Sequence, residues 1–441
     1  MDNTEAHMYS AIASALDTGK SKFIIYPYGA RGGRFKRILN ADYGIQEIAV
    51  IDENAKSMDV NIIHMDQMDS EDYRDCYIFV VSDHSEIWFE LRKNLLRYVS
   101  PDHIIDIFPR IKIETVKKMI DGERISVLFN PVLHPKKDDM GSVGLNTGNL
   151  VFAEAIKENY VFDIESVLSR EWIQYDVGRN VFAVFSASNF INPGATWIEG
   201  LIPILEKTKM NMTFAGLGAQ GNLDDLPSDI VDSLSEKQIY FFKMVSERAN
   251  SIGVRGEFTA ACLEKMGIRN IDIIGCPSFF QYKTTYPIIQ SASTQKILYT
   301  TDIRKERIYS LVKNENAELV RQEYSDGKEE DPLFFDFYEW DRYIQKQEYT
   351  FAFGSRFHGN MMALRNKVPT LWLTHDWRTL ELVRYLKLPY LDYHGEVFKN
   401  IKHVEELIEY CDYNNLYKEY PKLLKKYVDF IKRNMGFDSK T

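Results

Sequence analysis

The feature that most constrains this chain of 441 residues is a rhythm of short apolar runs, each followed by a turn and a helical pattern. The first runs lie within residues 23–108 and include KFIIYPYG and CYIFVVS. Uninterrupted apolar runs of this length suit strands that are buried on both faces of a parallel sheet, and the helices between them suit crossover connections. We therefore predict an α/β fold.

The rhythm resumes twice after residue 124. The runs are RISVLFNP, VFAVFSAS, NMTFAGLG, NSIGVRG and IRNIDIIGCP in one series, and KILYTTD, YTFAFGS and PTLWLTHD in the next. The stretch 281–295, rich in Ser, Thr, Tyr and Pro, is the best candidate for a linker between them. We predict three parts of roughly 150 residues each. These are an N-terminal Rossmann-like α/β domain (1–108), a first lobe (109–280), and a second lobe with a C-terminal helix (281–441).

Charge and cysteine content exclude several classes of protein. The net charge is −10, whereas a nucleic-acid binder normally shows a basic face, so we expect no nucleic-acid partner. The four cysteines form no CxxC pair and no metal-ligand spacing, which is typical of buried thiols in a reducing compartment. The N-terminus has no apolar signal core, and polar residues interrupt the apolar stretch 181–205. We therefore expect a cytoplasmic protein.

Two further segments have a clear pattern. In LLKKYVDFIKRN, near the end of the chain, the apolar residues fall on one face of a helix. We expect this helix to pack back on the body of the protein, because an isolated helix of this length is marginal. The charge-rich stretch 313–331 is expected to be a solvated surface.

Candidate functional residues lie where the predicted strands end, because ligands of open parallel sheets bind beyond the carboxyl ends of the strands. The densest group follows YTFAFG and opens a helix, and it contains Arg356 and His358. The free N–H groups of a helix start hold phosphate or carboxylate, an arginine adds a bidentate fork, and a histidine can move protons near neutral pH. The structural alternative is a capping arginine beside a hydrogen-bonded histidine.

One crossover later, the strand PTLWLT ends in His375, Asp376 and Arg378. Consecutive right-handed βαβ units can place their strand ends side by side, so Arg378 can face the same crevice as Arg356 and His358. His375 beside Asp376 could form an oriented acid–base pair. The alternative for these two residues is a solvated turn.

The first lobe contributes further candidates. Arg255 ends a strand just before the helix EFTAACLEKM, where its charge is unfavourable against the helix dipole, and this favours a ligand partner. Two small, polar, glycine-rich segments permit close approach of the backbone to a ligand. Their residues are Asn146, Thr147, Gly148 and Asn149 ahead of LVFAEAIKEN, and Gly218 and Gln220 in the loop GLGAQG.

Other catalytic patterns are absent from the sequence. It has no carboxylate pair spaced for glycoside hydrolysis, no GxxxxGK[ST] loop and no HExxH. Three arginines and one histidine at a cleft between two lobes are typical of an anion-binding transferase. We expect it to need no metal and no cofactor.

The combination of these segments resembles the polysaccharide pyruvyl transferase family over roughly residues 124–395. The resemblance is carried by NTGN, by GVR ahead of a helix, by GCPS, and by SRFHGNMMAL followed by the P-T-L strand and HDWR. It implies a GT-B-like fold, with two Rossmann-like lobes and a catalytic cleft between them. It also implies transfer of a pyruvyl group from phosphoenolpyruvate to two sugar hydroxyls, as a cyclic ketal, in the biosynthesis of a surface polysaccharide such as a capsule or exopolysaccharide.

By this resemblance, Arg255, Arg356 and His358 fall on positions that bind phosphoenolpyruvate, the donor substrate. Arg378 stands where many members have a lysine, so we expect it to bind the anion rather than to exchange a proton. His358 is our choice for the proton-transfer group, with His375 as the next candidate. Gly256 stands where an acidic residue commonly follows the arginine. The expected acceptor is a lipid-linked or nucleotide-linked oligosaccharide, with peripheral contact to membrane-bound assembly enzymes as a further expectation.

Two other functions fit the same pattern. A two-lobed glycosyltransferase that uses a nucleotide-sugar would share the fold and a basic pocket. A catalytically silent sugar-binding subunit of a polysaccharide assembly system would bind an acceptor without turnover.

The N-terminal domain poses a separate question. Residues 28–34, between a strand and a helix, together with Asp52, partly resemble a dinucleotide-binding fingerprint. Because the glycine spacing is not GxGxxG, we favour a structural or partner-docking module.

Overall fold

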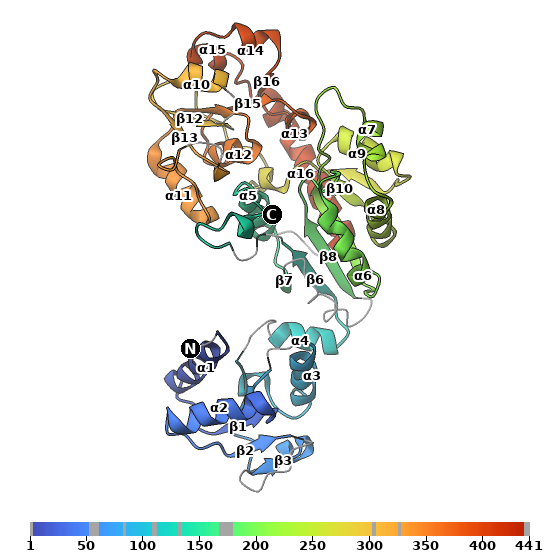
Figure 1. Ribbon diagram of the computed structural model, residues 1–441, viewed down its shortest axis with the longest axis vertical. Helices are drawn as coiled ribbons and strands as arrows, with labels where there is room; N and C mark the ends of the chain where they lie inside the picture. Colours follow the sequence, from blue (N-terminus) through green and yellow to red (C-terminus); the bar gives the residue numbers. More distant parts are fainter. Residues whose placement is uncertain are drawn as a thin grey trace. The chain divides into compact units, whose positions relative to one another are not determined.

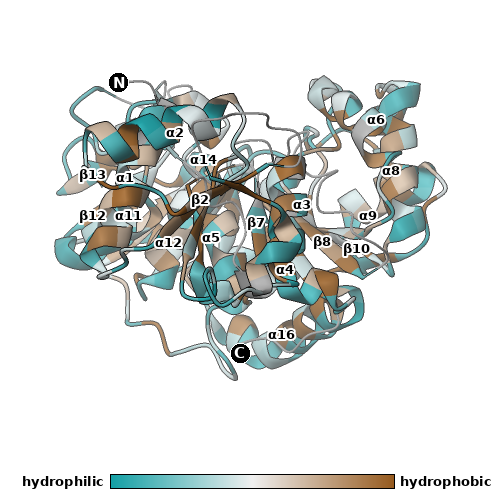
Figure 2. Ribbon diagram, turned by 90° about the horizontal axis from the view of Figure 1, so that it is seen from below, coloured by the Kyte–Doolittle hydropathy of each residue, from teal (hydrophilic) through white to brown (hydrophobic). Residues whose placement is uncertain are grey.

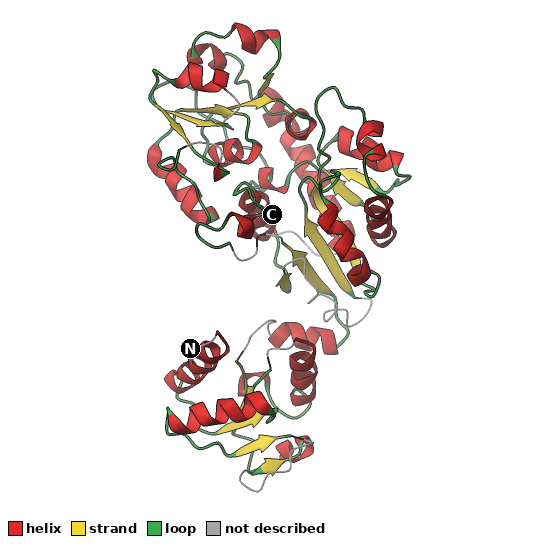
Figure 3. Cartoon of the chain, in the orientation of Figure 1, coloured by secondary structure: helices red, strands yellow, loops and turns green. Residues whose placement is uncertain are grey.

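A computed structural model describes nine parts of the chain: residues 3–52, 61–82, 85–107, 113–130, 132, 135–166, 180–301, 306–324 and 328–435. The chain divides into two compact units. The first contains Met1–Ile125, and the second joins Ser126–Arg170 to Val181–Thr441. Each sheet pairs strands in parallel and is covered by helices (Figures 1 and 3), so the predicted α/β fold is confirmed.

The first unit is one five-stranded sheet with the strand order β3-β2-β1-β4-β5, which is the order of the first five strands of the Rossmann fold. Its strands are β1 (Phe23–Tyr26), β2 (Ala49–Ile51), β3 (Ile62–Ile63), β4 (Tyr77–Val80) and β5 (Ile104–Asp106). Its helices are α1 (Asn3–Asp17), α2 (Ala30–Ala41), α3 (Ser85–Leu95) and α4 (Ile113–Ile120). The predicted domain boundary at residue 108 lies outside the described residues.

Removal of residues 1–122 is expected to leave the second unit folded. The first unit has an apolar core of its own, formed by residues such as Met8, Phe35 and Phe79, and units of this kind can fold alone. Far-UV circular dichroism and a single cooperative thermal transition would check this for the shortened chain. A shortened chain without a cooperative transition would contradict it.

The second unit begins with a six-stranded sheet, the first lobe, in the order β11-β10-β9-β8-β6-β7. Its strands are β6 (Ile125–Phe129), β7 (Ile164–Ser166), β8 (Val181–Ser186), β9 (Asn211–Leu217), β10 (Ile252–Val254) and β11 (Ile271–Ile273). Its helices are α5 (Asn149–Asn159), α6 (Ile202–Leu205), α7 (Pro227–Asp232), α8 (Glu236–Arg248) and α9 (Glu257–Lys265).

The second lobe is a five-stranded sheet in the order β13-β12-β14-β15-β16. Its strands are β12 (Ile297–Thr300), β13 (Ala317–Leu319), β14 (Phe351–Gly354), β15 (Thr370–Thr374) and β16 (Tyr390–Asp392). Its helices are α10 (Glu306–Val312), α11 (Phe337–Gln347), α12 (Phe357–Arg365), α13 (Trp377–Leu386), α14 (Glu396–Asn400) and α15 (Val404–Ile408). Two Rossmann-like lobes are therefore present, as the GT-B-like prediction requires.

The apolar runs of the sequence are the buried strands. Every residue of β12, β14 and β15 is buried, and Figure 2 shows strands of the chain in the brown of hydrophobic residues. The stretch 281–295 between the lobes contains no helix or strand. None of the described helices has the length and apolar composition that a membrane span requires.

The last helix, α16 (Asn414–Met435), connects the two lobes. It packs against β8 and β9 of the first lobe, although the chain reaches it only after completing the second. Asn434 accepts a hydrogen bond from the Ser251 N–H over 3.1 Å, and Phe430 is fully buried beside Gly253. The prediction that this helix packs back on the body is confirmed.

The stretch 313–331 is only partly the solvated surface that its charge predicted. It contains the strand β13, and the side chains of Arg321 and Gln322 are buried. Because Arg321 donates to the carbonyl oxygens of Asp331 and Glu329, its charge is satisfied inside the segment, and composition alone could not reveal this.

Candidate functional site

A cavity of about 230 Å³ lies between the two lobes of the second unit, beyond the carboxyl ends of their strands. Parallel α/β sheets place their ligands at this edge. Its residues from the first lobe are Gly144, Asn146, Asn149, Ser188, Asn189 and Arg255. Its residues from the second lobe are Gln322, Ser355, Arg356, Phe357, His358, His375, Arg378, Thr379 and Leu382. The predicted arginines and histidines thus meet in one place.

Arg255 enters the cavity from the first lobe. It follows β10 directly, precedes α9, and is only 4% exposed. Its Nε donates to the Gly216 carbonyl over 2.9 Å, and its Nη1 donates to Asn189 Oδ1 over 2.8 Å. Among the described residues, its buried Nη2 has no hydrogen-bond partner. Because a buried charged donor without a partner is costly, a ligand atom is the natural partner.

Arg356 is the residue before α12, and its guanidinium is paired with a carboxylate of the same lobe. Its Nη1 lies 3.1 Å from Glu323 Oε1. Asn146 of the first lobe donates to the same oxygen over 2.9 Å. Glu323 therefore joins an arginine and an amide from the two lobes at the edge of the cavity.

His358 lies in the first turn of α12. Its Nε2 is 3.5 Å from Cys276 Sγ, and its ring packs against Phe152 at 5.4 Å between centroids. Burial, and then the positive charges of Arg255 and Arg378, hold the pKa of His358 well below its usual range. The imidazole is therefore neutral at neutral pH.

The segment that follows β15 is built into the interface between the lobes. Asp376 caps α13 by accepting from the Thr379 N–H over 3.0 Å, and Arg378 Nη2 lies 2.6 Å from Asp376 Oδ2. Burial raises the pKa of Asp376, but the charges of Arg378 and His375, together with hydrogen bonds from Thr379 and Arg378, lower it below its usual value. His375 Nε2 lies 3.7 Å from the same carboxylate oxygen. The alternative of a solvated turn is wrong, because Asp376 is buried.

A second cavity, of about 520 Å³, adjoins the first and shares His375 and Arg378 with it. Its remaining walls are mostly neutral and polar. They are Asn192, Pro193, Gln220, Gly221, Asn222, Asp225, Ile230, Ser233 and Asp376. Amide and hydroxyl groups of this kind can form hydrogen bonds with a polyol.

Three predicted residues line neither cavity. Thr147 is fully buried, and its N–H donates to the Gln322 carbonyl over 2.9 Å. The Gly148 N–H donates to Asn146 Oδ1 over 2.8 Å. A β-carbon at Gly218 would lie 2.9 Å from Arg255 Cδ, so Gly218 makes room for the arginine. All three lie behind the residues that line the cavities.

Several residues of the site were not predicted. Asn189 follows β8, and the strand-end rule that found Arg255 could have found it. Ser355 opens the predicted group that contains Arg356 and His358 but was given no role, and among the described residues its buried hydroxyl has no hydrogen-bond partner. Gln322 accepts from the Gly359 N–H, and nothing in its charged surroundings indicated that it would line the cavity.

Fold and site together define a two-lobed α/β protein with arginines of both lobes and histidines of the second lobe around one cavity. A sequence model of polysaccharide pyruvyl transferases matches residues 146–376, which is more than half of the chain. The chain belongs to the polysaccharide pyruvyl transferase family, as the sequence predicted. It is therefore a member of a family of transferases.

Solved structures resemble the chain at low identity. A functionally uncharacterized protein from Klebsiella pneumoniae is 12% identical, over 59% of this chain and 88% of its own, with a TM-score of 0.34. MnaA of S. aureus in complex with UDP is 13% identical, over 70% and 96%, with a TM-score of 0.35. A UDP-N-acetylglucosamine 2-epimerase from Rickettsia bellii is 12% identical, over 71% and 98%, with a TM-score of 0.30. No curated protein matches the chain.

Proposed function

We propose that the chain transfers a pyruvyl group from phosphoenolpyruvate to a sugar diol, as a cyclic ketal, during the biosynthesis of a surface polysaccharide. The observation that carries this proposal is the meeting of Arg255, Arg356, Arg378 and His358 around one small cavity. Phosphoenolpyruvate carries a carboxylate and a phosphate, and arginines are suited to both because they offer several donors in a fixed geometry.

The size of the cavity also favours a small anion. Pockets for drug-sized ligands measure about 300–1,000 Å³, whereas this cavity measures about 230 Å³. Among the described residues, Arg255 Nη2 and the Ser355 hydroxyl have no hydrogen-bond partner, and they are the first donors that we assign to the donor substrate. The adjoining cavity, with its amide walls, is the place that we assign to the sugar acceptor.

The reaction needs a proton at the methylene carbon of the donor, attack of a sugar hydroxyl at the neighbouring carbon, and loss of phosphate. The second hydroxyl then closes the ketal ring. We assign the proton transfer to His358. Burial, and then the positive charges of Arg255 and Arg378, keep its imidazole neutral, and the negative charge of the donor would offset the second of these two causes. Arginines can stabilise the leaving phosphate electrostatically.

Phosphorus NMR of the purified protein with phosphoenolpyruvate and a lipid-linked or nucleotide-linked sugar tests the proposal. We expect inorganic phosphate to appear only when donor and acceptor are both present, together with an acceptor product that is heavier by one pyruvyl ketal. Release of a nucleoside diphosphate from a nucleotide-sugar would support the glycosyltransferase alternative instead. Acceptor binding without turnover of either donor would support the silent subunit.

Glu323→Gln is expected to tighten phosphoenolpyruvate binding by up to about fivefold, because partly exposed ion pairs contribute about 0.2–1 kcal/mol. The Glu323 carboxylate lies 3.1 Å from Arg356 Nη1, so it would compete with the donor for this guanidinium. Glutamine removes the charge but can still accept from Asn146. Isothermal titration calorimetry measures the change. Weaker binding in this variant would show that the carboxylate orients Arg356 rather than competing for it.

A further inference from the structure

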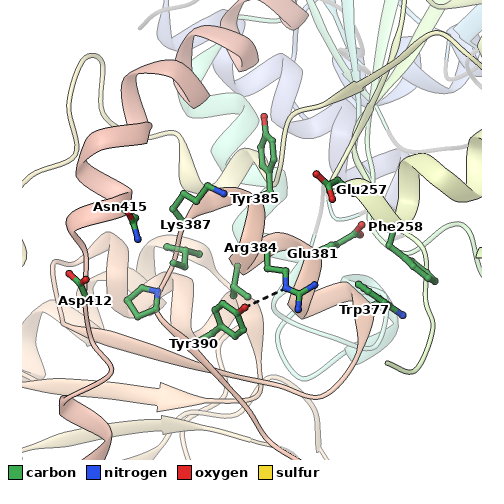
Figure 4. Close-up of a pocket in the computed structure, with 13 residues that line it drawn as sticks. Glu257, Phe258, Trp377, Glu381, Arg384, Tyr385, Lys387, Tyr390, Asp412 and Asn415 are labelled. Carbon is green, nitrogen blue, oxygen red and sulfur yellow. Dashed lines mark hydrogen bonds between the residues drawn. The ribbon is translucent and has the colours of Figure 1, made fainter. Parts of the chain in front are cut away.

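A carboxylate of the second lobe caps a helix of the first lobe. Glu381 projects from α13 toward α9, and it is 4% exposed (Figure 4). Its Oε2 accepts from the Thr259 N–H over 3.0 Å, and its Oε1 accepts from the Thr259 hydroxyl over 2.6 Å. Thr259 is the third residue of α9, so Glu381 satisfies one of the N–H groups that a helix start leaves without a partner in the helix.

The helix cannot supply this cap itself. The residue before α9 is Gly256, which has no side chain to accept a hydrogen bond. A β-carbon at Gly256 would lie 2.6 Å from Glu381 Cβ and 2.9 Å from its Oε2. Glu381 therefore occupies the space that a capping side chain at position 256 would need.

The contact between Glu381 and Thr259 is connected to three parts of the site. Arg255 directly precedes Gly256, and Arg378 lies one helical turn before Glu381 on α13. The Thr259 hydroxyl also accepts from the Ala219 N–H over 2.9 Å, in the loop that carries Gln220. A shift at Glu381 would therefore move the two arginines relative to each other, because they are fixed to different lobes.

We propose that Glu381 is a positioning residue, which caps α9 from the second lobe and thereby sets the spacing of Arg255 and Arg378 across the cavity. In this role it touches no substrate. This inference rests on the proposed function in one point, namely that the anion bound by the two arginines is phosphoenolpyruvate.

Glu381 also lines a cavity of about 580 Å³, here called the rear cavity, whose lining residues are shown in Figure 4. The charged groups around it are Arg255 and Asp376, the Cys262 thiol of α9, and Glu257, Arg384 and Lys387, which line this rear cavity. Burial raises the pKa of Glu381 to about 7, although the hydrogen bonds from Thr259 act in the opposite direction. The stability that the protonated Glu381 side chain contributes is therefore complete below the pKa of this group in the unfolded chain. It is lost as the pH rises through the folded-state pKa of about 7.

Two substitutions at this position separate hydrogen bonding from charge. Glu381→Ala removes the cap, and we expect it to weaken binding of phosphoenolpyruvate and of inorganic phosphate by about 10- to 100-fold, as small misplacements in a site do. Glu381→Gln keeps the acceptor for the Thr259 N–H and should bind both anions within about threefold of the unchanged protein. Its melting temperature should rise relative to that of the unchanged protein between about pH 4.5 and pH 7 and level off above pH 7, because it has no carboxylate to ionise.

A matched control removes another cap. Asp336 caps α11 by accepting from the Glu339 N–H over 2.8 Å, and it lines neither cavity of the site. Asp336→Ala should lower the melting temperature and leave anion affinity unchanged. If Glu381→Ala kept its anion affinity within twofold, or if Asp336→Ala lost as much affinity, the positioning role would be wrong.

The two proposals fail in different ways. If the unchanged protein binds phosphate but does not consume phosphoenolpyruvate with any acceptor, the proposed function is wrong. The phosphate affinities of the variants then still decide the role of Glu381. If the unchanged protein binds neither anion, the positioning role is overturned as well.

Discussion

Arg255→Ala is expected to weaken phosphoenolpyruvate binding by about 100-fold, because hydrogen bonds to charged groups in a sheltered site contribute about 1.5–3 kcal/mol each. The substitution removes the most buried guanidinium of the cavity, with its free Nη2, and leaves Asn189 Oδ1 and the Gly216 carbonyl without this donor. Isothermal titration calorimetry and kcat/KM for the donor measure the loss.

A surface arginine of the same lobe gives the matched control. Arg269 is exposed and donates to the Glu264 carbonyl over 3.2 Å, so Arg269→Ala should leave donor binding unchanged. Arg255→Lys should recover only part of the affinity, because an ammonium lacks the fork that reaches Gly216, Asn189 and a ligand together. Unchanged donor affinity in a folded Arg255→Ala protein would remove this residue from the donor site.

His358→Gln is expected to keep donor binding and to lower kcat by about two to four orders of magnitude. Glutamine roughly preserves the size and can form hydrogen bonds, but it cannot exchange a proton near neutral pH. Steady-state kinetics, donor affinity and melting temperature on one preparation distinguish the outcomes. His394→Gln, an exposed histidine of the same lobe, is the control.

Each other outcome for His358 has its own meaning. A raised KM at an unchanged kcat would show that the imidazole positions the phosphate. A change confined to the melting temperature would show that its packing against Phe152 and Cys276 is its main role. An intact kcat would leave His375 as the next group to test, since it lines both cavities.

The strand pattern predicted most of the fold because its strands are buried on both faces and therefore appear as continuous apolar runs. The pattern did not predict two short edge strands, because β13 and β16 have three residues each and are only partly buried. The strand-end rule located Arg255, Arg356, His358 and Arg378 for a related reason, since parallel strands place all their carboxyl ends at one edge.

What sequence could not predict depends on contacts between distant segments. Glu323 reaches Asn146 across 177 positions of sequence, and Glu381 reaches Thr259 across 122. Neither carboxylate lies at a strand end, and neither has a neighbouring residue that indicates its partner. Gly256 stands where family members commonly have an acidic residue, and the sequence did not explain this difference. In the structure, Glu381 lies against Gly256.

The last helix of the chain has a consequence for synthesis. The first lobe has all its strands once residue 273 has been made, but α16, which packs on β8 and β9, ends only at Met435. At about 5–20 residues per second on the ribosome, this lobe waits on the order of 10–30 s with an apolar face uncovered. A nascent chain that stalls in the second lobe would present this face to chaperones. Truncation of the chain before residue 414 should therefore lower the stability of the first lobe as well as that of the second.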